Sequence, residues 1–204
     1  MVKPYIVGLG GTTRVGSSTE KALSLSLKTA AEQGADTLLL CGRDLDVPAY
    51  NPGGGTPNPA ARRIVAEMRR ADGIILGTPG YHGGISGLVK NALDYTEELK
   101  TDRRPYLEGR AVGCIATAAG EQGAITTLIA LRSVVHALRG WPTPLGAAIV
   151  TSDEVFDATG NCLSPRVEMQ LKIVSQQVLD FALLQTEKIG RFESHARTGL
   201  VFGR

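Results

Sequence analysis

The stretch YIVGLGGTTRVGSST, residues 5–19, runs from an apolar segment into a loop of glycines and hydroxyl side chains. The first part, Tyr5–Leu9, is almost continuously apolar and lacks the polar alternation of a half-buried strand. Such a run is typical of a parallel strand whose two faces are both covered. Residues 17–32 then place Leu23 and Leu27 at helical spacing. The stretch therefore predicts a buried strand, a loop and a helix.

The same alternation continues along the chain. Four further strands are predicted, at Thr37–Cys41, Gly73–Gly77, Ala111–Ala116 and Gly146–Val150. Helices are predicted at about 59–70, 86–99 and 124–139, with a last one after Pro165. Five strand–helix units indicate a parallel sheet with helices on both faces, and right-handed crossovers make a doubly wound α/β sheet the simplest topology. We expect one domain over residues 1–190, and a tail over 191–204 that frays or forms an arm in an oligomer.

Composition excludes several classes of protein. The net charge is +2, with 22 basic and 20 acidic residues, and aromatic residues make up 5% of the chain, which argues against a nucleic-acid surface. Cys41, Cys114 and Cys162 form no CxxC pair, which argues against a disulfide framework or a zinc site. No apolar stretch approaches the ~18 residues needed to span a bilayer, and residues 1–5 show no signal-peptide pattern. We expect no membrane association and a cytoplasmic location.

The loop after the first strand is a candidate phosphate site, because free amides and the positive end of a helix dipole meet there. The dinucleotide pattern G-x-G-x-x-G starting at Gly8 fails, since Thr13 stands where the third glycine is needed. The nucleotide pattern G-x-x-x-x-G-K-[ST] starting at Gly11 fails as well, because Ser17 replaces the lysine. Both common nucleotide-binding fingerprints are therefore excluded.

What remains is a loop rich in hydroxyls with a single guanidinium. Such a donor set suits one terminal phosphate monoester. The candidate residues are Thr12, Thr13, Arg14, Ser17, Ser18 and Thr19. The simpler alternative is that Ser17 or Ser18 only caps the helix, with Glu20 in its first turn. A cap accounts for one of these hydroxyls and leaves the others, and Arg14, unexplained.

The third predicted strand is followed by TPGYHGGISGLVKNALDY, Thr78–Tyr95. This run resembles the T-P-x-Y-x-G-x-x-x-G-x-x-K-N-x-[IL]-D segment of the NAD(P)H-dependent FMN reductase family. The first loop and the segment Trp141–Gly146 extend the resemblance to about Phe181. It implies a flavodoxin-like fold with strand order 2-1-3-4-5. The family often has an acidic residue where Gly80 stands, and this chain lacks any role of that side chain.

The resemblance also implies where FMN binds. The phosphate is expected in the first loop and the isoalloxazine edge along the second, at Pro79, Gly80, Tyr81, His82 and Gly83. The loop after the fourth strand is expected to approach the pyrimidine end, at Thr117, Ala118, Ala119 and Gly120. The family usually has a glycine-richer third loop, so Ala118–Ala119 departs from its pattern. Hydride transfer needs alignment and no obligatory side-chain acid, so no catalytic residue is assigned, and His82 is expected to contribute its backbone alone.

The expected function is reduction of FMN by NADPH or NADH, with the reduced flavin supplied to a partner monooxygenase. The first alternative is retained FMN that reduces a quinone, an azo dye or a metal oxyanion. An electron carrier of the flavodoxin type is less favoured, because the pI is about 8.5 and only Tyr81 supplies an aromatic ring in a candidate flavin loop. A binding module with a vestigial site is a third reading. The family resemblance also implies a homodimer or homotetramer.

Overall fold

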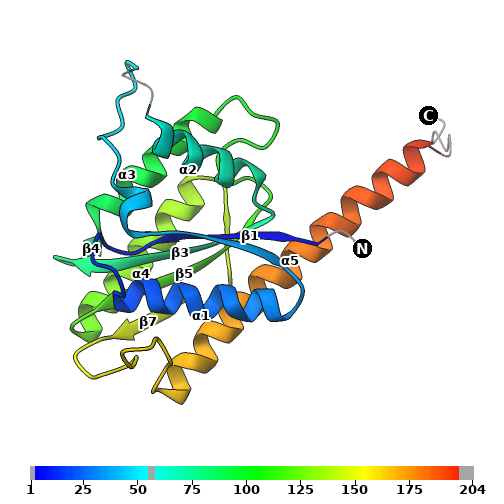
Figure 1. Ribbon diagram of the computed structural model, residues 1–204. Coiled ribbons are helices and arrows are strands. Elements are labelled where there is room, and N and C mark those ends of the chain that lie inside the picture. The colour runs from blue at the N-terminus through cyan, green and yellow to red at the C-terminus, as the bar shows by residue number, and fades with distance from the viewer. Residues whose placement is uncertain (1–2, 55–57, 198–204) are drawn as a thin grey trace.

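The computed structural model describes residues 3–54 and 58–197 and centres on a parallel sheet (Figure 1). Its parallel strands are β1 (Tyr5–Gly10), β2 (Asp36–Leu40), β3 (Gly73–Tyr81), β5 (Ala111–Ala118), β6 (Trp141–Pro142) and β7 (Ala147–Val150). The order across the sheet is β2-β1-β3-β5-β6, and β7 pairs with β5 beyond β6. Because β6 and β7 share the fifth position, the predicted order 2-1-3-4-5 is confirmed, and it is that of the flavodoxin-like fold.

Helices cover both faces of the sheet, as predicted. On one face, α1 (Ser18–Glu32) and α5 (Pro165–Arg197) pack over a cluster that includes Leu23 and Val178. On the other face lie α2 (Pro59–Arg70), α3 (Gly87–Asp94) and α4 (Glu121–Ala137), over a second core cluster. Two 3₁₀ turns, η1 (Gly42–Leu45) and η2 (Tyr95–Leu99), complete the elements. The helix predicted over 86–99 is thus divided into α3 and η2.

The last helix is longer than its apolar pattern indicated. It continues to Arg197, and its C-terminal part extends beyond the body of the protein (Figure 1). Residues 191–197, expected in a tail, therefore belong to α5, while 198–204 lie outside the described residues. Within the described ranges no helix, α5 included, is long and apolar enough to cross a bilayer.

The third strand also runs further than predicted, past Gly77 to Tyr81. Its end pairs antiparallel with β4 (Gly84–Ile85), so that Gly80 lies opposite Ile85 and Tyr81 opposite Gly84. The two connecting residues, His82 and Gly83, have φ angles of 53° and 79°. Two successive positive φ values match the twist of a tight two-residue hairpin. The second candidate loop is therefore a β-hairpin that projects from the sheet.

Candidate functional site

The three candidate loops meet at the carboxyl edge of the sheet. The amide of Gly11 donates to the carbonyl of Gly77 at 3.1 Å, which joins the first loop to β3. The sheet register places Pro79 opposite Thr117, which joins the second loop to the third. Open α/β sheets bind ligands in the crevice outside this edge, where the strand order reverses. The predicted residues are thus brought together by three neighbouring strands.

The first loop is shaped by two short-range hydrogen bonds. The Thr12 hydroxyl accepts from the amide of Arg14 at 3.1 Å, and the Ser17 hydroxyl accepts from the amide of Glu20 at 3.3 Å. Ser17 therefore caps α1, as the simpler alternative required for one hydroxyl. Gly16, at φ +70°, makes the turn between these two bonds in a conformation that favours glycine.

Several amides of this loop have no hydrogen-bond acceptor among the described residues. Within residues 3–54 and 58–197, the N–H groups of Thr13, Val15, Ser18 and Thr19 donate no hydrogen bond. The side chain of Arg14 is exposed beside them. Amides at a helix start, together with an exposed guanidinium, are a donor set that can bind an anion.

A carboxylate already uses one amide of the loop. The amide of Gly16 donates to Oε2 of Glu20 at 2.9 Å, while the backbone of Glu20 takes part in the Ser17 cap. Burial in the first place, and then the carboxylates of Glu20 and Asp44, raise the pKa of the Cys41 thiol to about 11. Glu20 thus lies between the first loop and the end of β2.

Two of the predicted residues turn their hydroxyls inward. Thr19 and Thr117 are 1% and 5% exposed, and their hydroxyl oxygens lie 2.6 Å apart. Since each hydroxyl is satisfied by the other, the amide of Thr19 is the group that this residue can offer to a ligand. The predicted assignment of both residues to the cofactor site stays a prediction, and their side chains tie α1 to β5.

The second loop combines a buried base with an exposed tip. Thr78 accepts from the amide of Ser86 at 3.0 Å and donates to the carbonyl of Pro79 at 3.0 Å, which closes the base of the hairpin. Pro79 is buried, whereas Tyr81 is 55% exposed and His82 and Gly83 lie at the surface. The flat side chain of Tyr81 is thus available to cover a ring bound at this edge.

Gly80 has a steric reason to be glycine. A Cβ atom there would lie 2.5 Å from Oγ1 of Thr127 and 3.2 Å from the carbonyl oxygen of Gly123. The first turns of α4 therefore occupy the space that an acidic side chain at this position would need. The departure from the family pattern at Gly80 is accompanied by close packing of the hairpin on α4.

The third loop is hydrogen-bonded at its first residue and exposed at its last two. Ala118 is buried, and its carbonyl accepts from the amide of Thr151 at 2.8 Å. Ala119 and Gly120 are exposed, and Gly120 precedes α4 with no side-chain cap. The start of α4 can therefore stabilise negative charge on a ligand at this edge.

A fourth segment at this edge, residues 47–50, is held by Asn91 and Tyr95, and the sequence did not predict this role. The side chain of Asn91 accepts from the amide of Tyr50 at 2.8 Å and donates to the carbonyls of Val47 and Pro48 at 3.2 and 3.0 Å. The Tyr95 hydroxyl also donates to the Pro48 carbonyl, at 3.0 Å. Asn91 and Tyr95 lay within the recognised motif, but which segment they would hold depends on tertiary structure.

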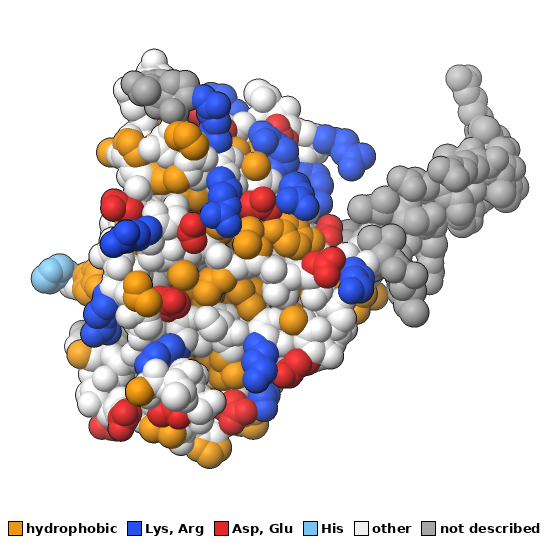
Figure 2. All heavy atoms as spheres, viewed as in Figure 1, with side chains coloured by type: hydrophobic (Ala, Val, Ile, Leu, Met, Phe, Trp, Pro, Cys, Tyr) orange, Lys and Arg blue, Asp and Glu red, His pale blue; other side chains and the backbone are white. Residues whose placement is uncertain are grey.

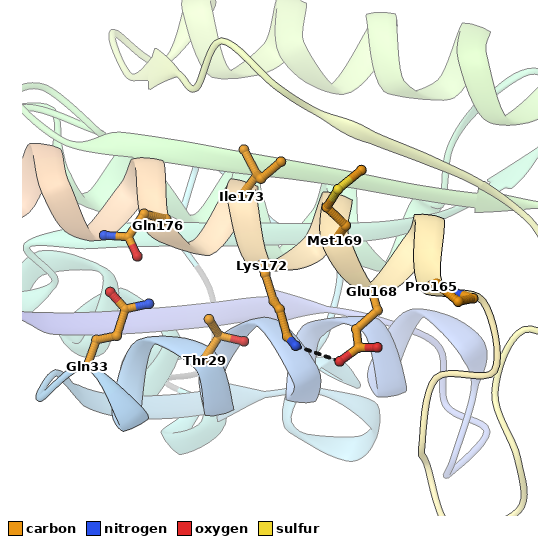
Figure 3. Close-up of a pocket in the computed structure, with 8 residues that line it drawn as sticks. All are labelled: Thr29, Gln33, Pro165, Glu168, Met169, Lys172, Ile173 and Gln176. Carbon is orange, nitrogen blue, oxygen red and sulfur yellow. Dashed lines mark ion pairs between the residues drawn. The ribbon is translucent and has the colours of Figure 1, made fainter.

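Two surface grooves follow α1. One, of about 460 Å³, lies between the last turns of α1 and the first turns of α5, where Lys172 pairs with Glu168 at 2.6 Å (Figure 3). The other, of about 520 Å³, runs from Gly16 along α1 to residues 158–162. Neither is lined by the hairpin or by the third loop. In the described part of the chain, no group of three or more His, Cys, Asp or Glu residues could hold a metal ion.

Known proteins that are similar to this chain include flavin-dependent reductases. The family model described as NADPH-dependent FMN reductase matches residues 4–154. The chain is 32% identical over 120 residues to an FMN-dependent NADPH-azoreductase of Staphylococcus haemolyticus, which covers 56% of this chain and 58% of the relative. It is 36% identical over 116 residues to that of Staphylococcus aureus, covering 54% and 56%. The chain thus spans somewhat more than half the length of these curated relatives.

Among solved structures, the chain is similar to FerB, a flavoenzyme NAD(P)H:(acceptor) oxidoreductase from Paracoccus denitrificans. The TM-score is 0.73 at 20% identity, over 89% of this chain and 98% of the other. At this identity the likeness shows the fold, which agrees with the observed strand order.

Proposed function

Because the chain belongs to the NADPH-dependent FMN reductase family, we propose that it binds FMN at the carboxyl edge of its sheet and reduces it with NADPH. The names of the two staphylococcal relatives support this choice of cofactor and donor. The assay described below also tests NADH as an alternative hydride donor.

The observation that carries the proposal is the donor set of the first loop. The amides of Thr13, Val15, Ser18 and Thr19 lack acceptors among the described residues, and Arg14 is exposed beside them. In the proposed complex these groups hold the phosphate of FMN. A phosphate monoester carries close to two negative charges at neutral pH, so charge-assisted hydrogen bonds favour it over an uncharged group.

The rest of the edge would then orient the flavin. Bound FMN would accept a hydride from the nicotinamide, which is chemistry that the cofactor supplies. The backbone of the hairpin, from Pro79 to Gly83, would line one edge of the ring system, and Tyr81 would cover part of it. The start of α4 would stabilise negative charge that develops on the ring, and Ala119–Gly120 allow close backbone approach. The protein thus contributes alignment and charge stabilisation.

Two fates of the reduced flavin are proposed. In the first, reduced FMN leaves and supplies a partner monooxygenase, as the sequence resemblance implies. In the second, FMN stays bound and reduces an acceptor such as an azo compound. The names of the azoreductase relatives support this second candidate.

The deciding experiment is a steady-state assay of NADPH and NADH oxidation, with free FMN, riboflavin and an azo dye as variable substrates. Saturation by free FMN, without flavin retained on gel filtration, supports the first fate. Retained flavin with turnover of the azo dye supports the second. Failure of the protein to bind FMN more tightly than riboflavin would contradict the proposed phosphate site.

We also propose that the chain self-associates, as a homodimer or homotetramer. Ile125 and Ile129 are 52% and 59% exposed on α4, next to the hairpin that carries Tyr81. Covering these side chains would remove apolar surface from water. Light scattering on the purified protein gives the oligomeric state, and a monomer that persists at high protein concentration would contradict the proposal.

A further inference from the structure

Glu20 is the one acidic side chain bonded to a backbone amide of the first loop in the described structure. Its Oε2 accepts from the amide of Gly16 at 2.9 Å. The same residue is fixed at its backbone, whose amide donates to the Ser17 cap at 3.3 Å. The carboxylate is half-buried. Glu20 is therefore held at the loop from both ends, which differs from a solvated acid on a helix surface.

A carboxylate and a phosphate would bind the same groups of this loop, its backbone amides. Both are anionic acceptors that favour amides at the start of a helix. The amides of Val15 and Ser18, which are proposed to bind phosphate, lie one and two positions along the chain from the Gly16 amide that is bonded to Glu20. A phosphate in this cradle would lie close to a like charge, and it would meet one amide already bonded to that charge. Like charges at short range disfavour each other, most of all where solvent is partly excluded.

We propose that Glu20 competes with the FMN phosphate for the amide of Gly16 and so weakens the hold of the protein on its cofactor. This inference rests on the proposed function and deepens it, because it names a residue that sets the balance between retained and released flavin. Because Glu20 would compete with the phosphate group alone, it should weaken the binding of FMN and of inorganic phosphate and leave the affinity for riboflavin unchanged.

The test compares flavin affinities of protein freed of flavin, measured by quenching of flavin fluorescence. Glu20→Gln keeps the length of the side chain and an oxygen acceptor but removes the charge. We expect it to bind FMN about tenfold more tightly than the unmodified protein, with riboflavin affinity changed by less than about twofold. Glu32→Gln is the matched control, because Glu32 lies at the other end of α1 and pairs with Lys28 on the surface at 3.9 Å. It should leave both affinities unchanged.

The outcomes distinguish failure of the proposed competition from failure of the proposed phosphate site. Unchanged FMN affinity in Glu20→Gln would overturn the competition, and weaker FMN affinity would show that Glu20 organises the loop instead. If the unmodified protein shows no preference for FMN over riboflavin, the proposed phosphate site itself fails.

If Glu20→Gln folds poorly, an NMR titration of the unmodified protein tests the competition instead. On titration with inorganic phosphate, the amide resonance of Gly16 should shift together with those of Val15 and Ser18, since the bond to Glu20 is replaced. A Gly16 resonance that stays fixed while its neighbours move would overturn the competition.

Discussion

The hydroxyl oxygens of Thr19 and Thr117 lie 2.6 Å apart, in the core beneath the candidate site. This single bond joins the first turn of α1 to the carboxyl end of β5, across 98 residues of sequence. It connects the helix that follows the first loop to the strand that precedes the third. A buried pair of polar groups thus links the two halves of the candidate site.

Replacing one member of this pair should cost stability. In Thr19→Val the hydroxyl of Thr117 stays buried without its partner, and we expect the free energy of unfolding to fall by about 1–3 kcal/mol. The double variant Thr19→Val/Thr117→Val should lose less than the sum, because neither site then leaves a polar group unsatisfied. Urea unfolding of Thr19→Val, Thr117→Val and the double variant checks this, and additive losses would contradict it.

Arg14 should matter for the phosphate and little for folding. Its side chain is exposed, so Arg14→Ala should change the free energy of unfolding by less than about 0.5 kcal/mol. Loss of a charge-assisted contact should weaken FMN binding by about ten- to a hundredfold. Arg62→Ala, at an exposed position on α2, is the control. Unchanged FMN affinity in Arg14→Ala, measured by fluorescence quenching, would remove Arg14 from the phosphate site.

Asn91 should hold the segment of residues 47–50 in place. Its amide makes three of the hydrogen bonds that fix this segment, so Asn91→Ala should speed amide hydrogen exchange at Tyr50 and lower stability by about 1–3 kcal/mol. Lys90→Ala is the control, since Lys90 lies on the same helix and pairs with Asp94 on the surface. Equal exchange at Tyr50 in the two variants would show that other contacts fix the segment.

Asp157 should make the segment before α5 sensitive to acid. Hydrogen bonds from Asn161 and Thr159 lower the pKa of Asp157 to about 2. A carboxyl with a lowered folded-state pKa adds stability above its unfolded pKa of about 3.9, and that stability is lost as pH falls through about 2. The melting temperature should therefore drop more steeply between pH 4 and pH 2 than in Asp157→Ala. Parallel curves for the two proteins would contradict this.

The alternation of buried strands and helices could be predicted from the sequence because it depends on local patterns, whereas the strand order 2-1-3-4-5 was predicted from the family resemblance. Runs such as Tyr5–Leu9 are apolar throughout, and the helical spacing between them leaves few topologies for a parallel sheet. The glycines and hydroxyls between Gly11 and Thr19 likewise indicate an anion loop wherever they follow a buried strand. These features rest on residues close together in the chain.

What only the tertiary structure decided is where individual side chains of that loop point. The Thr19 hydroxyl contacts Thr117, 98 residues away. The Ser17 cap and the bond from the Gly16 amide to Glu20, by contrast, join residues three and four positions apart, and the sequence already offered the cap as an alternative. Gly80 is confined by Thr127, and Asn91 reaches back more than 40 residues to hold Tyr50. A hydroxyl or an amide can bond to any suitable group that the fold brings near, so residue type limits its role without choosing its partner. The sequence determined which hydrogen-bonding groups follow the first strand, and packing between distant segments determined which of them are already bonded within the protein.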